Sequence, residues 1–476
     1  MKTTIKTDIC VIGAGSGGLS VAAGTSQLGL STVLIEKDKM GGDCLNTGCV
    51  PSKALLAAAK NAHIKQSSDI PGIAATEPRI DFLSIKHHVS DVIKSIEPND
   101  SQQRFEGLGV TVLRNEARFI SPNLIRSGDE VIQAKYVVIA TGSRPVIPPI
   151  KDINTASPLT NETIFNLSEK PEHLLIIGAG PIGIEMAQAH CRLGSQVSIF
   201  DMATLLPRDD ESNVSTLREV LVNDGINLYE RVAIKQIKKE NDLITVCLER
   251  NEKIFEVSGS HLLVSAGRSP VTDTLDLDKA GIKYDKKGIS VDKRLRTNKK
   301  HIYAIGDVSG GPQFTHIAGY HAGIVIRNIC FKIPAKVDYR ALPWVTFTDP
   351  ELAQVGLTEK QAKIEYGNNI KVTQWPFREN DRAIAERTIT GNVRVITTRR
   401  GHILGASIIG PHAGELCQVW GLAISSRLKI GAIAGMIAPY PTLAEINKRV
   451  AGAWFTQNLF SQKTKILVRL LQKLPF

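Results

Sequence analysis

The sequence has few of the features that place a protein in a membrane or outside the cell. Seven cysteines among 476 residues are far from the density of a secreted protein held together by disulfides. No apolar run approaches the ~20 residues of a membrane-spanning helix. The N-terminus passes from Met1 and Lys2 into a strand pattern, without the apolar region of a signal peptide. We therefore expect a cytoplasmic protein.

Basic and aromatic residues are not interleaved anywhere along the chain. The net charge of +11 would permit association with anionic surfaces, but Lys and Arg are spread throughout, so we expect no nucleic-acid partner. With 42% hydrophobic and 22% charged residues, the composition is that of an ordinary soluble protein. A chain of 476 residues is too long for one hydrophobic core, so we expect several domains.

A glycine-rich loop lies between a predicted strand and a predicted helix near the N-terminus. Residues 5–12 are typical of a buried parallel strand, Gly13-Ala14-Gly15-Ser16-Gly17-Gly18 follows directly, and a second strand over residues 32–36 ends in Glu36. A Gly-x-Gly-x-x-Gly loop in this setting, with an acid about twenty residues further on, is the dinucleotide-binding fingerprint. A glycine-rich turn without function is the alternative.

Each part of this loop has a physical role in a nucleotide site. Gly13 allows the tight turn, Gly15 lets the backbone approach a pyrophosphate, and Gly18 allows close packing. The N-terminus of the following helix favours phosphate charge. Glu36 would bind ribose hydroxyls.

The same pattern recurs in the middle of the chain. His173–Ile177 is typical of a strand, Gly178-Ala179-Gly180-Pro181-Ile182-Gly183 repeats the fingerprint, and the strand Gln196–Asp201 ends in an acid. Gly178, Gly180 and Gly183 therefore correspond to the glycines of the first loop. A chain with two dinucleotide sites points to electron transfer between two cofactors.

Two cysteines, Cys44 and Cys49, lie five residues apart in the run from Gly41 to Lys53. In an ideal helix this spacing separates the Cα atoms by roughly 8–9 Å, whereas a disulfide needs at most ~7 Å. The segment must be distorted if the two thiols are to bond, and Gly48 supplies the backbone freedom for it. The spacing differs from that of thioredoxin-type sites and zinc knuckles, and we expect no metal site. Two unrelated buried cysteines are the alternative.

The run from Gly41 to Lys53 resembles the redox-active motif of the class I flavoprotein disulfide reductases, a group that includes dihydrolipoamide dehydrogenase, glutathione reductase and mercuric reductase. Residues 302–308 resemble the second FAD motif of that family, and the resemblance extends over about residues 5–460. It implies an α/β fold with two Rossmann-like dinucleotide-binding domains, for FAD and NAD, and an α+β C-terminal dimerisation domain. A homodimer is implied in the same way, because in that family the second subunit completes each active site.

The expected domains follow from this resemblance and from two strand-and-turn segments, residues 136–145 and 262–270, that fit a domain interrupted by another. For each segment, a strand and turn without function is the alternative. We expect a discontinuous FAD-binding domain, an NAD(P)-binding domain, a dimerisation domain and a basic amphipathic tail, at residues 1–149 with 271–337, 150–270, 338–460 and 461–476, respectively.

The resemblance also implies which residues bind the two cofactors. Tight, non-covalent FAD and a nicotinamide nucleotide would be bound by Gly13, Gly15, Gly18, Glu36, Lys37, Gly42, Thr141, Gly142, Gly178, Gly180, Gly183, Asp201, Gly267, Gly306 and Asp307. The carboxylate of Asp201 can accept a hydrogen bond from a ribose 2′-hydroxyl and would repel a 2′-phosphate. We therefore expect NAD(H) rather than NADP(H).

The implied reaction passes electrons from NADH through FAD to a Cys44–Cys49 disulfide, or the reverse. By resemblance, Cys49 is the flavin-proximal sulfur and Cys44 exchanges with a dithiol or disulfide substrate of the lipoyl type. Lys53 and Glu185 match positions that form an ion pair beside the flavin. A surface lysine and a surface glutamate are the alternative for that pair.

The chain departs from the family pattern at Tyr440. Dihydrolipoamide dehydrogenases carry histidine there, paired with a glutamate that is present in this chain as Glu445. An imidazole titrates near neutrality and an unperturbed phenol near ~10, so Tyr440 is a poor base at neutral pH. It could donate a proton, or it could simply pack at the dimer interface.

The electron acceptor therefore stays open. Mercuric reductases also place tyrosine at this position, but they bear a vicinal cysteine pair near the C-terminus, and this chain has no cysteine after Cys417. A dihydrolipoamide dehydrogenase-like enzyme is the first hypothesis, and a mercuric reductase-like or quinone reductase is the second. A non-enzymatic, membrane-associated scaffold is a third.

The last residues predict an amphipathic helix. On a helical wheel the apolar residues Ile466, Leu467, Leu470, Leu471 and Leu474 share one face, opposite the basic residues Lys465, Arg469 and Lys473. Such a helix could pack on its own domain, or it could attach weakly to an anionic membrane surface. The second alternative would make the cytoplasmic protein peripheral to a membrane.

Overall fold

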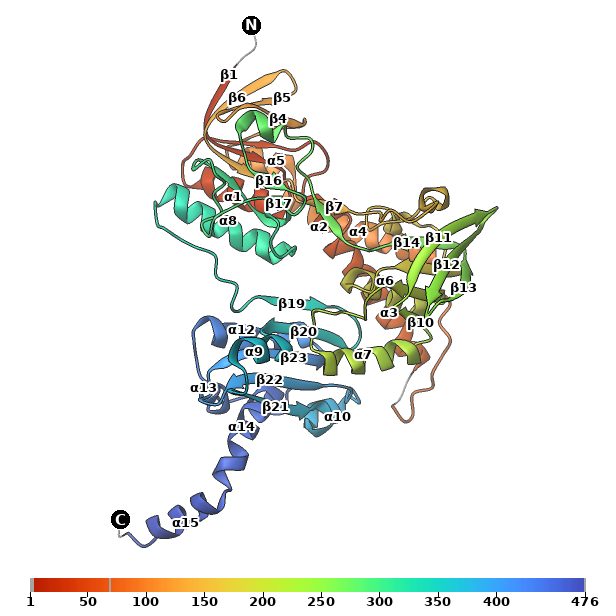
Figure 1. Cartoon of the computed structure of the whole chain (residues 1–476), viewed down its shortest axis with the longest axis vertical. Helices are drawn as coiled ribbons and strands as arrows, with labels where there is room; N and C mark the ends of the chain where they lie inside the picture. Colours follow the sequence, from red (N-terminus) through yellow and green to blue (C-terminus); the bar gives the residue numbers. More distant parts are fainter. Residues whose placement is uncertain (1–3, 68–69, 475–476) are drawn as a thin grey trace.

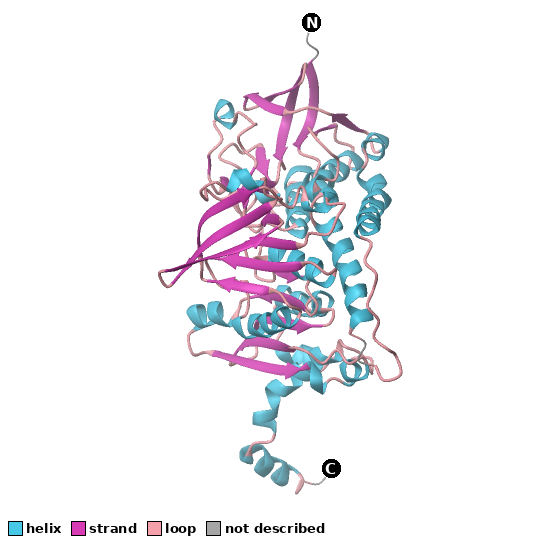
Figure 2. Ribbon diagram, turned by 90° about the vertical axis from the view of Figure 1, so that its right-hand side faces the viewer, coloured by secondary structure: helices cyan, strands magenta, loops and turns pink. Residues whose placement is uncertain are grey.

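The computed structural model describes residues 4–67 and 70–474. Figure 1 shows three lobes: one that carries the N-terminus, a second beside it, and a third that carries the C-terminus. The two termini lie at opposite ends of the long axis, as Figure 2 also shows.

The first lobe is built on a sheet whose central strands are parallel. The order is β3-β2-β1-β6-β5-β4, and β18 pairs with the end of β6. Only β4 and β5 run antiparallel to their neighbours. These strands are β1 (Thr4–Ile12), β2 (Thr32–Ile35), β3 (Val110–Leu113), β4 (Ala117–Ser121), β5 (Leu124–Ser127), β6 (Glu130–Ile139) and β18 (Ile302–Ala304). The helices α1 (Ser16–Gln27) and α8 (Thr315–Cys330) pack against each other in this lobe.

The second lobe repeats the parallel pattern on a smaller scale. Its parallel sheet has the order β10-β9-β8-β14, and a three-stranded antiparallel sheet, β11-β12-β13, lies next to it. The strands are β8 (His173–Ile177), β9 (Gln196–Asp201), β10 (Asn227–Glu230), β11 (Ala233–Glu240), β12 (Leu243–Arg250), β13 (Lys253–Gly259) and β14 (His261–Val264). Its two helices are α6 (Pro181–Arg192) and α7 (Glu211–Asn223).

The chain enters and leaves the second lobe through two paired segments. β7 (Ser143–Pro145) leads out of the first lobe, and β15 (Arg268–Pro270) leads back into it. The two are antiparallel, with Arg144 opposite Ser269. A short two-stranded ribbon therefore joins the lobes and brings the segment after β14 next to the segment after β6.

The third lobe has a five-stranded antiparallel sheet of order β19-β20-β23-β22-β21. The strands are β19 (Pro343–Thr346), β20 (Glu351–Gly356), β21 (Ile370–Pro376), β22 (Asn392–Thr398) and β23 (Ile403–Gly410). A buried apolar cluster around Trp420 forms its core. The surrounding helices are α9 (Glu359–Tyr366), α10 (Asp381–Ala385), α11 (Ala413–Leu416), α12 (Gln418–Ser425), α13 (Ile430–Ala434) and α14 (Glu445–Leu459).

The last helix, α15 (Gln462–Leu471), extends beyond the body of the molecule (Figures 1 and 2). None of its residues is buried. The structure therefore does not pack this helix on its own domain. Among the described residues, no helix is both long and apolar enough to cross a membrane.

Candidate active site

The first glycine-rich loop joins β1 to α1 and is too tight for any side chain at two positions. A Cβ on Gly13, whose φ is +103°, would lie 2.5 Å from Ala140 O, and a Cβ on Gly18 would lie 1.8 Å from Gly13 O. At Gly15, by contrast, a Cβ would meet no atom within 4 Å. The space above Gly15 is thus open to a ligand, at the N-terminus of α1, where phosphate charge is favoured. The loop fits the pyrophosphate of FAD.

The acid at the end of β2 lies beside this loop. Glu36 Oε2 accepts a hydrogen bond from the N–H of Ala14 (2.6 Å), and Oε1 accepts one from the N–H of Asp38 (2.8 Å). These bonds hold the carboxylate at the rim of a large cavity, and Lys37 lines the same cavity. This is where the hydroxyls of a ribose would lie if its diphosphate were bound at Gly15.

The second loop, between β8 and α6, repeats this geometry. A Cβ on Gly178, whose φ is +109°, would lie 2.6 Å from Ser265 O, one on Gly183 would lie 2.0 Å from Gly178 O, and one on Gly180 would meet nothing within 4 Å. Asp201 Oδ2 accepts from the N–H of Ala179 at 2.6 Å. The two loops therefore offer equivalent dinucleotide sites.

The two cysteines lie on separate helices. Cys44 is in α2 (Gly42–Asn46), and Cys49 begins α3 (Cys49–Gln66) after a break at Gly48, whose φ and ψ are −128° and −109°. The distortion expected between the thiols is therefore present. The N–H of Gly41 donates to Ala14 O at 2.9 Å, so α2 lies directly against the first glycine loop.

The surroundings of the cysteines make their pKa values diverge. A hydrogen bond from Cys44 is the main cause that lowers the pKa of Cys49 to about 6, and it outweighs the effect of burial; Thr315 and the charge of Lys53 lower it further. The Oγ1 of Thr315, at the start of α8, lies 3.2 Å from Cys49 Sγ. The same hydrogen bond raises the pKa of Cys44, which burial raises further. In the reduced protein, Cys49 is thus the thiolate and Cys44 keeps its proton.

Lys53 and Glu185 are brought together. Lys53 Nζ lies 2.8 Å from Glu185 Oε2, and Glu185 is only 6% exposed. Phe347 completes the arrangement, because its N–H donates to Glu185 Oε1 at 2.9 Å and its ring centre lies 4.4 Å from Lys53 Nζ. The charge of Lys53 is thus fixed one helical turn after Cys49. The role of this pair beside a flavin stays a prediction.

Arg268, in β15 between the first and second lobes, contacts the segment that carries the two cysteines. It lies 3.1 Å from a carboxylate oxygen of Asp43, next to Cys44, and 3.9 Å from Asp307. Its Nε donates to Ser143 Oγ at 2.8 Å, and Ser143 donates in turn to Asp307. Burial raises the pKa of Asp307. Arg268 therefore compensates charge where the ribityl chain of FAD is expected.

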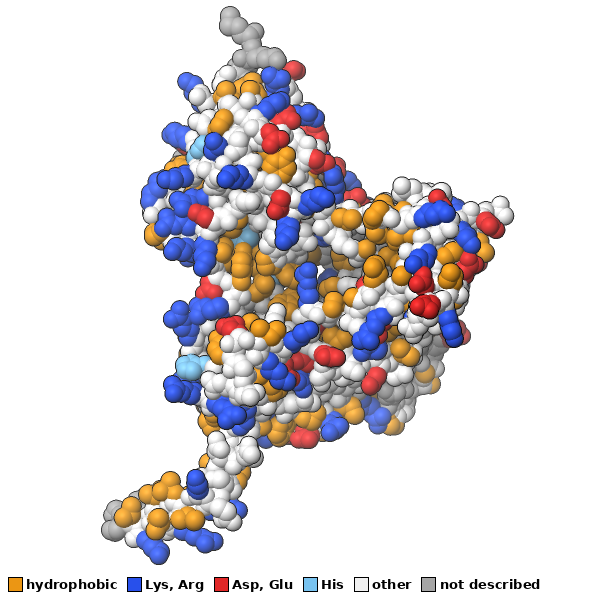
Figure 3. Space-filling model, in the orientation of Figure 1, with side chains coloured by type: hydrophobic (Ala, Val, Ile, Leu, Met, Phe, Trp, Pro, Cys, Tyr) orange, Lys and Arg blue, Asp and Glu red, His pale blue; other side chains and the backbone are white. Residues whose placement is uncertain are grey.

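A single cavity of about 4170 Å³ joins all these groups. Figure 3 shows a hollow on this face where the three lobes meet. The lining includes both open glycines, the two cysteines and most of the cofactor-binding residues predicted from the sequence: Gly13, Gly15, Glu36, Lys37, Gly42, Thr141, Gly142, Gly178, Gly180, Asp201, Gly267, Gly306 and Asp307. The remaining two, Gly18 and Gly183, lie beneath their loops, where each packs against the carbonyl of the first glycine of its loop.

Two residues that were predicted as catalytic lie outside this cavity. Tyr440 and Glu445 do not line this cavity. Tyr440 is 68% exposed and its hydroxyl donates to Asp381 Oδ2 at 3.1 Å, whereas Glu445 forms an ion pair with Arg449 at 2.8 Å. The hydrogen bond to Asp381 raises the pKa of Tyr440. Within a single chain they do not face the cysteines, and their role in a homodimer stays a prediction.

Three residues of the site were not predicted as site residues from the sequence. Thr315, Arg268 and Phe347 contact the redox segment or its ion pair from distant parts of the chain. Arg268 follows the predicted Gly267 turn, so its neighbourhood, but not its partners, could have been found. Among the residues that the structure describes, no group of three His, Cys, Asp or Glu is arranged to hold a metal ion.

Two nucleotide loops that open onto one dithiol define a flavin-linked disulfide oxidoreductase. Comparison with known proteins agrees. Residues 7–322 match the family described as pyridine nucleotide-disulphide oxidoreductase, and residues 342–451 match its dimerisation domain. The chain therefore belongs to the pyridine nucleotide–disulphide oxidoreductase family, and the predicted fold class, with two Rossmann-like domains and a C-terminal dimerisation domain, is confirmed. The dimerisation domain supports a homodimer.

Relatives with different names match almost the whole chain. The dihydrolipoyl dehydrogenase of Geobacillus stearothermophilus is 35% identical over 94% of this chain and 96% of its own length. The mercuric reductase of Streptomyces lividans is 33% identical over 95% and 97%. Among solved structures, the HOCl-induced flavoprotein disulfide reductase RclA from Escherichia coli matches with a TM-score of 0.84 at 27% identity, over 94% and 99% of the two chains, and its Cu(II) complex matches as well.

Proposed function

We propose that the protein is a dihydrolipoamide dehydrogenase-like enzyme that exchanges electrons between NAD(H) and a dithiol or disulfide of the lipoyl type. The observation that supports this most strongly is the one cavity that joins both glycine loops to Cys44 and Cys49. When bound, FAD would supply two-electron transfer between the nucleotide and the cysteine pair. It would be held at Gly15, Glu36 and Asp307, and the nucleotide at Gly180 and Asp201.

The residues of the chain divide the thiol chemistry between them. Cys49 is the thiolate next to the flavin, and its charge is stabilised by Cys44, Thr315 and Lys53. Cys44, which carries the proton in the reduced pair, is the sulfur that exchanges with the substrate, because Cys49 is held beside the flavin. To attack a disulfide it must lose that proton, because the thiolate is the nucleophile. Cys44 attacks one substrate sulfur and the substrate S–S bond breaks, which leaves a mixed disulfide. Cys49 then attacks Cys44, so that the Cys44–Cys49 disulfide forms and the substrate leaves as a dithiol, with one proton from Cys44 and one from solvent.

We propose NAD(H) as the nucleotide. The carboxylate of Asp201 is fixed at the end of β9 by the N–H groups of Ala179 and Ala203, at 2.6 and 2.7 Å. A 2′-phosphate would place a second negative charge against it, whereas a 2′-hydroxyl can donate to it.

The first test is the reduction of NAD and of NADP by dihydrolipoamide, with purified holoenzyme that accepts electrons from NADH. We expect turnover with NAD and at least about tenfold lower kcat/KM with NADP, which corresponds to ~1.4 kcal/mol. Turnover with NADP equal to that with NAD would contradict the nucleotide assignment. No turnover with dihydrolipoamide, while NADH still reduces flavin and disulfide, would contradict the substrate assignment.

A metal-ion acceptor is the second candidate. Two observations favour it: Tyr440 stands where the dihydrolipoamide dehydrogenases carry histidine, and the relatives include a mercuric reductase. Soft thiolates such as Cys49 are suitable ligands for soft metal ions. The absence of cysteine after Cys417 weighs against it. NADH oxidation that depends on mercuric ion, in protein that does not turn over lipoamide, would favour this candidate, and quinones are tested in the same way.

We also propose that α15 makes a weak contact with an anionic membrane surface. The apolar face of this helix is exposed, with Ile466, Leu467 and Leu470 at 56%, 53% and 57%. Figure 3 shows hydrophobic side chains on one side of the helix and basic ones on another. From residue 446 to residue 476 the chain has no Asp or Glu and six basic residues, Lys448, Arg449, Lys463, Lys465, Arg469 and Lys473. Apolar burial combined with cationic charge suits an anionic lipid surface.

The membrane proposal predicts that vesicles with anionic lipid bind the full-length protein and that vesicles of phosphatidylcholine alone do not. Replacing Lys465 and Arg469 with glutamine should weaken binding by about 30-fold, since each cation near such a surface is worth ~1 kcal/mol. Co-sedimentation at low and high salt measures this. The matched control is Arg250→Gln with Lys253→Gln, which removes the same charge from the exposed end of β12 and β13. Equal binding by both variants, or none by the parent, would contradict the contact.

A further inference from the structure

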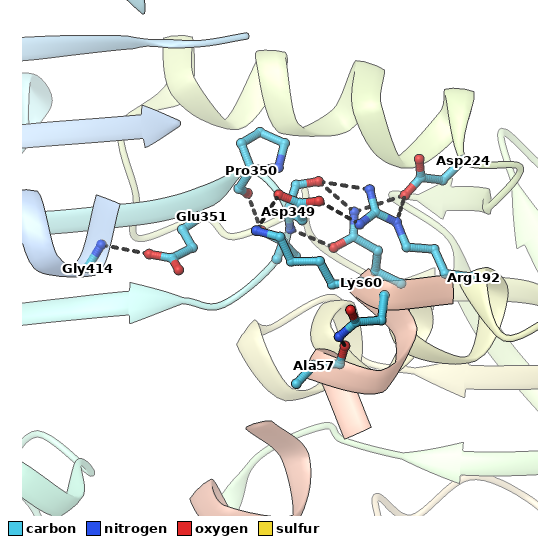
Figure 4. Close-up of polar contacts among 11 residues, drawn as sticks. Ala57, Lys60, Arg192, Asp224, Asp349, Pro350, Glu351 and Gly414 are labelled. Carbon is cyan, nitrogen blue, oxygen red and sulfur yellow. Dashed lines mark hydrogen bonds and ion pairs between the residues drawn. The ribbon is translucent and has the colours of Figure 1, made fainter. Parts of the chain in front are cut away.

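A turn of the dimerisation domain lies between the helices that carry the redox residues. β19 and β20 are joined by residues 347–350, and Asp349 in this turn lies between Lys60 of α3 and Arg192 of α6 (Figure 4). These are the helices that begin with Cys49 and that carry Glu185, respectively. The turn therefore contacts both sides of the Lys53–Glu185 pair.

Asp349 is bound to both helices through its side chain and its backbone. Its carboxylate lies 3.3 Å from Lys60 Nζ and 2.8 Å from Arg192 Nη1. Its carbonyl oxygen accepts from Gln188 Nε2 at 3.0 Å and from Arg192 Nη2 at 3.1 Å, and its N–H donates to Gln188 Oε1 at 2.8 Å. Burial opposes ionisation of Asp349, but Lys60 and Arg192 lower its pKa overall. It is thus an anion that both helices share.

Arg192 is the buried partner in this network. Its side chain is only 6% exposed, and its Nε also donates to Asp224 Oδ2 at 2.9 Å. A buried guanidinium that loses a partner leaves a charge without full compensation. The geometry of α6 relative to the turn is therefore strongly specified.

The spacing along the helices connects this network to the redox site. Glu185, Gln188 and Arg192 follow at intervals of three and four, so they share one face of α6. Lys53 and Lys60 share one face of α3, two turns apart. The same turn that binds Gln188, Arg192 and Lys60 through Asp349 binds Glu185 and Lys53 through Phe347.

We propose that Asp349 is a positioning residue that holds α3 against α6, so that Lys53 stays paired with Glu185 next to Cys49. The proposal rests on the proposed role of Cys49 as the stabilised thiolate, but not on the identity of the acceptor. It links the dimerisation domain to the electrostatics of the redox pair within one chain. A residue that only joined two domains would affect stability and leave the thiolate unchanged.

The test measures how fast iodoacetamide alkylates Cys49 in the reduced protein across pH, read by peptide mass, beside thermal unfolding. Asp349→Asn removes the charge and keeps the backbone contacts. We expect the midpoint of the pH profile to rise by about half a unit, so that alkylation at pH 6 slows about twofold. Asp91→Asn, in an exposed pair with Lys94 that is 72% exposed on both sides, is the matched control and should shift nothing.

A double-mutant cycle separates positioning from a general effect. In a Lys53→Met background, Asp349→Asn should cause no further shift, because it acts through Lys53. An equal shift in both backgrounds, or lower thermal stability with an unchanged midpoint, would overturn the proposal. If Asp349→Asn does not fold, Lys60→Met removes only a contact that is 46% exposed, and it should shift the midpoint in the same direction. An unchanged midpoint in that variant would also overturn it.

Discussion

Replacing Cys44 with serine should abolish turnover with a disulfide substrate, by at least ~10³-fold in kcat, because the residue removed is the attacking nucleophile. NADH should still bleach the bound flavin in this variant, since serine is close to cysteine in size and the glycine loops at Gly15 and Gly180 are unchanged. Steady-state turnover and single-turnover flavin absorbance measure the two effects separately. Loss of flavin reduction together with turnover would show that the variant is damaged more widely.

The reduced wild-type protein should reveal which sulfur is ionised. The pKa of Cys49 is lowered to about 6, whereas that of Cys44 is raised. Alkylation of Cys49 should therefore rise with pH through a midpoint near 6 and level off about one pH unit higher, and Cys44 should react slowly over the same range. In a Cys44→Ala variant the hydrogen-bonding group is lost, so the midpoint for Cys49 should move upward. Faster labelling of Cys44 than of Cys49 at pH 7 would reverse the assigned roles.

Local patterns explain why much of the fold could be predicted from the sequence. The conformation at Gly13 and Gly178 depends on a strand, a turn and a helix that are adjacent in the chain, so the fingerprint is visible in a short window. The break between Cys44 and Cys49 could be predicted in the same way, because a disulfide does not tolerate the helical spacing and Gly48 is present. The boundaries of the expected domains stay predictions.

The contacts that lower the pKa of Cys49 and that hold α3 against α6 could not be predicted from the sequence. Thr315 approaches Cys49 from a helix that begins 266 residues later, and Asp349 approaches α6 from the third lobe. Nothing in the residues around Thr315 or Asp349 indicates these partners, because they depend on how three sheets pack together. For α15 the sequence showed an amphipathic helix but not what its apolar face contacts, since a helical wheel contains no information about neighbours.

Tyr440 stands where the resembling dihydrolipoamide dehydrogenases carry a histidine that acts on the thiols, so substitutions at this position should change the rate. Tyr440 donates its hydroxyl hydrogen to Asp381, which raises its pKa, so it keeps its proton at neutral pH and cannot accept one from a thiol. In the wild-type protein the rate with dihydrolipoamide should therefore rise with pH above neutrality, as the substrate thiols ionise unaided. Within one chain residue 440 does not face the cysteines, so it can act on the thiols only if the second subunit of a homodimer brings it to them. In that arrangement Tyr440→His would place an imidazole five residues before Glu445, and general base catalysis is worth 10²–10⁴-fold in other enzymes. We expect a gain of about 10²-fold at pH 7, at the lower end of that range, because Glu445 is already paired with Arg449.

Tyr440→Phe is the matched control, since it removes the hydroxyl and keeps the ring. Its rate should change less than about threefold, because a phenol that only donates to Asp381 at 3.1 Å performs no proton transfer. Both variants are compared by the pH profile of kcat/KM for dihydrolipoamide. A fall of 10²-fold in Tyr440→Phe would mean that the tyrosine itself moves the proton. If the histidine variant gains nothing at pH 7 and its profile does not flatten, proton removal does not limit the reaction. The acceptor would then be one that needs no thiol base, such as a soft metal ion.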